Sequence, residues 1–256
     1  MDLLKHFMII SKNVEASSAF VIFDLKNEPK IESLSAKELE VYSKFTSRKR
    51  QHEFVAGRIA CKKAFFKLTS GNAKREVTIP KSTSEKSRKE ECAECKADCF
   101  EKFPSVSVLN TETGAPFIEN SDFFVSVSHS HGMAIASVSN HAVGVDIEQI
   151  NPKRIPALKK MSAEIYAEDS IGVHTKSQNA EELTALWTLK ESLGKALRTG
   201  IVEDFRRYDT KNFRHENGLY RCDFENFPLF SGIAITNKKY VAAIVAPSAN
   251  FATEHP

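Results

Sequence analysis

The sequence predicts an α+β fold in which helices pack on antiparallel sheets, and three observations support this prediction. Residues 142–148 alternate apolar and polar side chains, as in a strand that is buried on one face. Residues 123–128 and 133–139 flank a turn-forming His-Gly step, as in a β-hairpin. Residues 179–200 carry leucines at the 3.6-residue spacing of a helix that covers a core.

The helix predicted over residues 179–200 has an unusual lysine. Asn179 is a favourable N-cap, and Gly200 follows the last apolar residue, where helices often end. Lys190 falls in the middle of the apolar face, and a lysine is rarely buried without a partner, so an anionic group is expected beside it. Glu191 and Lys195 are four residues apart, and an ordinary surface ion pair is one interpretation of them.

The strand predicted over residues 142–148 places two carboxylates on one face. Asp146 and Glu148 are two residues apart, so their like charges repel unless something separates them. A solvated sheet face is one explanation. The other is a divalent cation, because Mg²⁺ is usually held by a few carboxylates together with water and phosphate oxygens. Glu191 of the helix is then the expected third carboxylate.

Three motifs in this order resemble those of 4'-phosphopantetheinyl transferases. The segment Gly144–Glu148 (Gly-Val-Asp-Ile-Glu) is followed about forty residues later by Trp187–Ala196 (Trp-x-x-Lys-Glu-Ser-x-x-Lys-Ala). Upstream, Ser126–Ser130 (Ser-Val-Ser-His-Ser) is similar to the serine-histidine-serine motif of the longer, surfactin-synthetase-activating type. The motifs cover roughly the middle third of the chain.

The resemblance implies two pseudo-symmetric halves, each an antiparallel sheet packed with helices, with the site between them. The expected boundaries are residues 1–140 and 141–256, and the expected state is a monomer built as a pseudo-dimer. An insertion at about 81–103 has no counterpart in the family pattern. It contains Cys92, Cys95 and Cys99, for which zinc binding is an alternative, although a structural zinc site normally needs four ligands.

The resemblance also implies the reaction and its site. The phosphopantetheine arm of coenzyme A would be transferred to a serine of an apo acyl or peptidyl carrier protein, which releases adenosine 3',5'-bisphosphate. Mg²⁺, with Mn²⁺ as an alternative, would be held by Asp146, Glu148 and Glu191. The expected catalytic residues are Glu191, Lys195 and Lys190. Coenzyme A would be bound by Arg50, Arg58, Ser128, His129 and Lys195.

A rival hypothesis is a non-catalytic protein that binds nucleotides or nucleic acid through the basic residues at 48–58. Acidic residues argue against this hypothesis, because without a metal ion they would repel the phosphate groups of the ligand. The net charge of +3 is also too small to indicate nucleic-acid binding. We therefore expect no nucleic-acid partner. The longest apolar runs are shorter than a membrane helix needs, so no membrane association is expected. The start of the chain does not resemble a signal peptide, and five cysteines do not suit a disulfide framework, so a cytoplasmic location is predicted.

Overall fold

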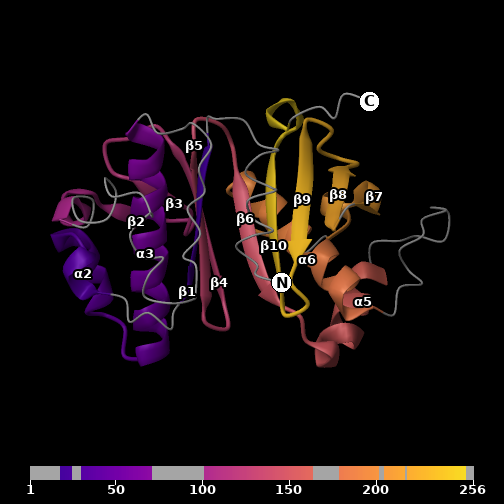
Figure 1. The fold of residues 1–256 in the computed structure, drawn as a ribbon, viewed down its shortest axis with the longest axis horizontal. Helices are drawn as coiled ribbons and strands as arrows, with labels where there is room; N and C mark the ends of the chain where they lie inside the picture. Colours follow the sequence, from indigo (N-terminus) through magenta and orange to yellow (C-terminus); the bar gives the residue numbers. More distant parts are fainter. Residues whose placement is uncertain are drawn as a thin grey trace, which may run out of the picture.

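Two antiparallel sheets, each covered by one long helix, form most of the molecule (Figure 1). The structure is a computed structural model, and it describes residues 18–24, 30–70, 101–163, 179–201, 205–216 and 218–251. The predicted α+β class is confirmed. Residues 81–100 of the predicted insertion, with Cys92, Cys95 and Cys99, lie outside the described residues.

The first sheet has the strand order β1-β5-β4. Its strands, and the helix α3 that packs against all of them, are β1 (Ser18–Asp24), β4 (Phe124–Ser130), β5 (Met133–Ser139) and α3 (Arg48–Thr69). Small side chains of α3, such as Ala60 and Ala64, pack against Val125 and Val138 of the sheet. The predicted hairpin is therefore present, and the basic residues at 48–58 belong to α3.

A buried ion pair fixes the elements around α3. Ser35 caps α2 (Ala36–Tyr42) through a capping box with Glu38, as its sequence indicates. The Glu38 carboxylate also accepts hydrogen bonds from Lys62 Nζ of α3 at 2.5 Å and from the backbone of Val108 at 2.9 Å. Val108 begins a short antiparallel hairpin of β2 (Val108–Asn110) and β3 (Pro116–Ile118).

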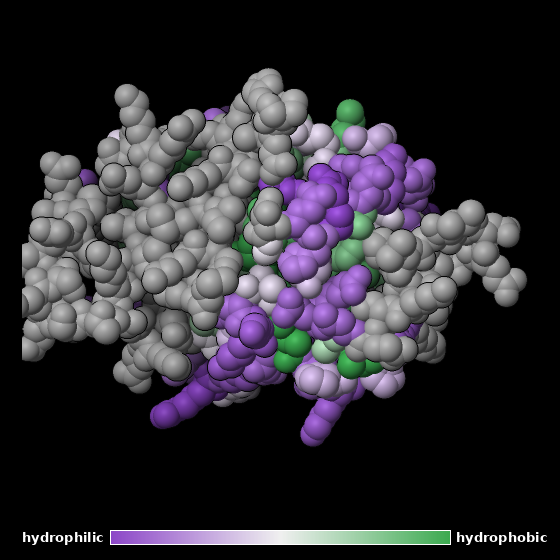
Figure 2. All heavy atoms as spheres, turned by 45° about the vertical axis from the view of Figure 1, so that its right-hand side comes forward, coloured by the Kyte–Doolittle hydropathy of each residue, from purple (hydrophilic) through white to green (hydrophobic). Residues whose placement is uncertain are grey.

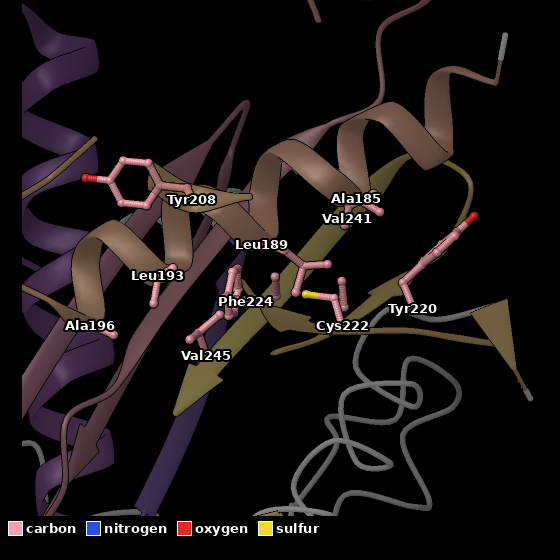
Figure 3. Close-up of a cluster of buried hydrophobic side chains, with 12 residues drawn as sticks. Ala185, Leu189, Leu193, Ala196, Tyr208, Tyr220, Cys222, Phe224, Val241 and Val245 are labelled. Carbon is pink, nitrogen blue, oxygen red and sulfur yellow. The ribbon is translucent and has the colours of Figure 1, made fainter. Parts of the chain in front are cut away.

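The second sheet has the order β6-β10-β9-β8-β7, and α6 covers one of its faces. The elements are β6 (Gly144–Gln149), β7 (Thr210–Glu216), β8 (Leu219–Phe224), β9 (Phe230–Thr236), β10 (Tyr240–Pro247) and α6 (Ala180–Ala196). Figure 3 shows Leu189 and Leu193 of α6 pointing onto the sheet, where Val245 of β10 and Phe224 of β8 complete a buried cluster. Edge strand β7 was not predicted from the sequence.

The remaining elements connect these layers. Four short 3-10 helices lie among the described residues outside the site: η1 (Ile31–Ser33), η2 (Phe103–Ser105), η5 (Phe205–Tyr208) and η6 (Ser248–Asn250). After β6 come η3 (Pro152–Arg154) and α5 (Ile155–Ala163), which packs against α6.

The face of the second half turned forward in Figure 2 is mainly hydrophilic among its coloured residues. Within the described part of the chain, no helix combines the length and apolar character needed to span a bilayer.

The two sheets meet where β4 lies beside β6 (Figure 1). The apolar side of β6, with Val143 just before it, packs with Ile135 of β5 in one buried cluster. The opposite side of β6 faces α6. Side chains from both sheets and from both long helices therefore reach the region around this junction.

Gly144 sets the distance between β6 and α6. A Cβ atom at this position would stand 1.8 Å from the backbone oxygen of Ser192 and 2.6 Å from the backbone nitrogen of Ala196. Backbone atoms of a helix cannot turn aside as a side-chain end can. Helix and strand are therefore in direct backbone contact, which only glycine permits here.

We expect Gly144→Ala to destabilise the protein by about 1–3 kcal/mol or more, because the added methyl group must push α6 away from the sheet. Urea denaturation measures this free energy of unfolding. Gly57→Ala is the matched control, since its Cβ would meet only a methyl group of Val127 at 3.1 Å. Equal stability of the two variants would contradict the proposed role of the backbone contact.

Candidate active site

Asp146 is the most deeply buried carboxylate of the predicted site. It lies on the α6 side of β6 and is 4% exposed. Its Oδ1 atom accepts hydrogen bonds from Ser128 Oγ of β4 at 2.6 Å and from Lys195 Nζ of α6 at 2.7 Å. Its Oδ2 atom is buried and has no hydrogen-bond partner. One oxygen is thus paired, and the other remains available to a ligand.

Glu148 follows on the same side of β6 and is more accessible. Arg154 of η3 donates from Nη1 to Glu148 Oε2 at 3.0 Å, and Ser130 Oγ donates to the same oxygen at 3.3 Å. The side chain of Glu148 is 21% exposed, and that of Arg154 is 38% exposed. This ion pair therefore borders solvent, whereas Asp146 lies inside.

Glu191 brings a third carboxylate from α6. Burial and the negative charge of Asp146 raise the pKa of Glu191 to about 7, and Glu148 adds to this rise. Lys195 and Arg154 oppose it. Glu191 therefore lies within the electrostatic field of both carboxylates of β6. Within the described ranges, however, no three His, Cys, Asp or Glu side chains are already grouped closely enough to hold a metal ion.

His129 faces the opposite way from the serines that flank it. Its ring lies beside Glu53 of α3, with Nδ1 3.8 Å from Glu53 Oε1. Burial lowers the pKa of His129, Glu53 raises it, and the positive charges of Arg50 and Lys195 lower it further. His129 therefore lies between α3 and α6, near cations from both halves of the molecule.

The two predicted arginines of α3 have different surroundings. Arg50 is exposed, and its guanidinium lies 5.6 Å from the centre of the Phe45 ring. Arg58 is only 8% exposed. It stacks 4.3 Å from the centre of the Phe54 ring and donates to Asn110 Oδ1 at the end of β2. Arg50 is thus accessible to a ligand, while Arg58 is largely enclosed by protein.

Lys190 does not join the carboxylates of β6. It is 3% exposed, and its Nζ lies 3.6 Å from Oδ1 of Asp209, which supplies the anionic group expected from the sequence. Burial lowers the pKa of Lys190 to about 8, despite the opposing effect of Asp209. Lys190 thus pairs with Asp209 and Lys195 with Asp146, although both lysines belong to α6.

Sequence reasoning missed four partners in the site. Ser126 and Ser130 of β4 accept hydrogen bonds from the backbone of β6, at Val145 and Gln149 respectively. Their alternation with Ser128 was the available signal, because a strand places every second residue on one side. Glu53 and Arg154 gave no such signal, since nothing in their spacing connects them to His129 or Glu148.

The site therefore combines carboxylates, lysine, arginine and histidine, a set suited to phosphate groups and a divalent cation. A family model for the 4'-phosphopantetheinyl transferase superfamily matches residues 142–245. The chain is 34% identical over 109 residues to the holo-[acyl-carrier-protein] synthase of Enterococcus faecalis, a match that covers 41% of this chain and 71% of that protein. The chain belongs to the 4'-phosphopantetheinyl transferase superfamily, so the resemblance of its motifs is confirmed.

Two further comparisons show how much of the chain is shared. The 4'-phosphopantetheinyl transferase gsp of Aneurinibacillus migulanus is 34% identical over 103 residues, which span 38% of this chain and only 41% of that relative. A solved holo-(acyl-carrier-protein) synthase from Bacillus anthracis, in complex with CoA (3',5'-ADP), is 25% identical, with a TM-score of 0.32. That alignment covers 49% of this chain and 95% of the synthase.

We expect Lys190→Met to remove a pH dependence of stability. Because the pKa of Lys190 falls from 10.5 to about 8 on folding, the unfolded chain binds more protons than the folded one between these pH values. Wild-type stability should therefore rise with pH across this interval, relative to the variant, by up to about 1.4 kcal/mol per pH unit.

The measurement is the free energy of unfolding of both proteins in urea at pH 7.5 and 9.5. Subtracting the value of the variant from that of wild type removes the contribution of the other groups that titrate. A difference that stays constant between the two pH values would mean that folding does not lower the pKa of Lys190.

Proposed function

We propose that this protein transfers the 4'-phosphopantetheine arm of coenzyme A to a serine hydroxyl of an apo carrier protein, releasing adenosine 3',5'-bisphosphate. The observation that carries this proposal is the ion pair of Asp146 on β6 with Lys195 on α6, together with the electrostatic effect of Asp146 and Glu148 on Glu191 of the same helix. Membership of the superfamily agrees with it. A cytoplasmic, monomeric protein remains the prediction from the sequence.

The proposed metal is Mg²⁺, with Mn²⁺ as an alternative, held by Asp146, Glu148 and Glu191. These side chains offer only oxygen donors, as Mg²⁺ prefers. The buried, unpartnered Oδ2 atom of Asp146 supports the assignment, because a buried polar atom without a partner is costly unless a ligand satisfies it. A bound cation would supply positive charge to the phosphate oxygens as negative charge grows on the leaving group.

Glu191 and Lys195 have the proposed chemical roles. The serine oxygen of the carrier attacks the phosphorus atom that bears the pantetheine arm, and the bond from that phosphorus to the adenosine bisphosphate oxygen breaks. Glu191 accepts the serine proton, directly or through water. Lys195 pairs with phosphate oxygens. Lys190, predicted as a third catalytic group, is better explained as the partner of Asp209.

Residues of β4 and α3, together with Lys195 of α6, are proposed to bind coenzyme A. Ser128 and His129 lie at the junction of the sheets, and the hydroxyl and ring nitrogens can hydrogen-bond phosphate oxygens. The exposed Arg50 of α3 is the proposed partner of the 3'-phosphate. Arg58 was predicted to share this role, but its burial against Phe54 and its bond to Asn110 favour an indirect contribution.

We expect Asp146→Ala and Glu191→Ala each to lower the transfer rate on the order of a hundredfold or more, while the protein stays folded. Removing one of several repelling carboxylates should not unfold the protein. The assay incubates the protein with coenzyme A, Mg²⁺ and an apo carrier protein, and mass spectrometry detects the carrier that has gained the arm. Glu40→Ala, an exposed carboxylate on α2, is the control. Unchanged transfer by both variants in excess Mg²⁺ would refute the metal site.

The proposed contact between Arg50 and the 3'-phosphate predicts that the protein prefers coenzyme A to dephospho-coenzyme A as the donor. We expect Arg50→Ala to reduce the preference for coenzyme A over dephospho-coenzyme A by roughly tenfold or more, since one charge-assisted hydrogen bond contributes about 1.5–3 kcal/mol. The measurement is the ratio of kcat/KM for the two donors. Arg214→Ala, an exposed arginine on β7, should leave this ratio unchanged. If Arg50→Ala also kept the wild-type ratio, the 3'-phosphate would bind elsewhere.

A further inference from the structure

Each carboxylate of β6 is already paired with a cation from its own chain. Lys195 Nζ lies 2.7 Å from Asp146 Oδ1, and Arg154 Nη1 lies 3.0 Å from Glu148 Oε2. The motifs of the sequence contain Lys195 but not Arg154. The arginine therefore needs an explanation of its own.

Arg154 is held where it can reach Glu148 without being fixed there. Its backbone nitrogen donates to the carbonyl of Asn151, whose side chain caps the same short helix at Lys153, so the backbone position is well defined. The side chain is 38% exposed and reaches Glu148 from the outside. It can leave the carboxylate for solvent without any change in the fold.

A divalent cation on Glu148 would compete with this ion pair. Arg154 contacts Glu148 Oε2, and a cation that approached the same carboxylate would be repelled by the guanidinium.

We propose that Arg154 is a positioning residue that competes with the divalent cation for Glu148 and pairs with a phosphate of coenzyme A once the metal displaces it. This inference rests on the proposed function. It makes metal binding and coenzyme A binding cooperative, because coenzyme A provides the displaced guanidinium with a new anionic partner. Arg154 thus weakens metal binding to the free protein and strengthens it in the presence of coenzyme A.

Calorimetric titration with Mn²⁺, without carrier protein, tests this inference. Arg154→Gln should bind Mn²⁺ about two- to fivefold more tightly than wild type in the absence of coenzyme A, the range expected for a partly exposed ion pair. With saturating coenzyme A, Arg154→Gln should bind Mn²⁺ no more tightly than wild type. The factor by which coenzyme A tightens Mn²⁺ binding should therefore fall.

Lys153→Gln is the matched control, because it removes the same charge from the adjacent exposed residue, for which no pairing with Glu148 is seen. A general loss of positive charge would tighten Mn²⁺ binding in both variants, with and without coenzyme A. If Arg154→Gln behaved like Lys153→Gln in both titrations, the inference would be overturned. The inference would also be overturned if coenzyme A tightened Mn²⁺ binding to Arg154→Gln by the same factor as it does for wild type.

The transfer assay separates this outcome from failure of the proposed function. Loss of the cooperative effect in an enzyme that still modifies a carrier, and that needs Asp146 to do so, refutes only the role of Arg154. Absence of transfer by the wild-type protein, together with Mn²⁺ binding that is unchanged in Asp146→Ala, refutes the metal site and with it the inference.

Discussion

The direct contact between Gly144 and α6 is the constraint on which the site depends. No side chain separates strand and helix at this point, so Ser192 and Ala196 of α6 lie against the backbone of β6. Residues on the same side of the strand then face the helix at short range. Lys195 reaches Asp146 for this reason, and Glu191 is brought into the field of both β6 carboxylates. A wider separation would let water between these charges and weaken their interaction.

Charged side chains that lie close together need partners of opposite charge. The resulting ion pairs differ in how far they are buried. Lys62 and Glu38, far from the site, are both fully buried, and Glu38 also accepts hydrogen bonds from the backbone of its own N-cap residue, Ser35, and of Val108 in β2. Breaking such a pair would leave a buried charge without compensation, so it holds the scaffold. The pairs of the site border solvent on at least one side, which lets their members change partners when a ligand arrives.

The sequence predicted those features that depend on local periodicity. Alternation predicted β6, leucine spacing predicted α6, and the burial of Lys190 predicted an anion beside it. That this anion is Asp209 could not be predicted, because the pairing depends on how the chain returns to α6. Strand β7 escaped prediction because a bulge between Lys211 and Arg214, with Asn212 at a φ of 53°, interrupts its alternation. Glu53 and Arg154 could not be predicted because their contacts are purely tertiary.

The serine-histidine-serine motif acquires a structural meaning from this arrangement. The hydroxyls of Ser126 and Ser130 bond to the backbone of β6, and that of Ser128 bonds to Asp146, so side chains rather than a continuous backbone ladder connect β4 to β6. His129, on the other side of the strand, meets Glu53 of α3. A single strand thereby fixes the carboxylates of one half relative to the basic helix of the other. Because hydroxyl hydrogen bonds are individually weak, the three serines act together, and the apolar cluster of Ile135 with β6 adds to the contact between the two sheets.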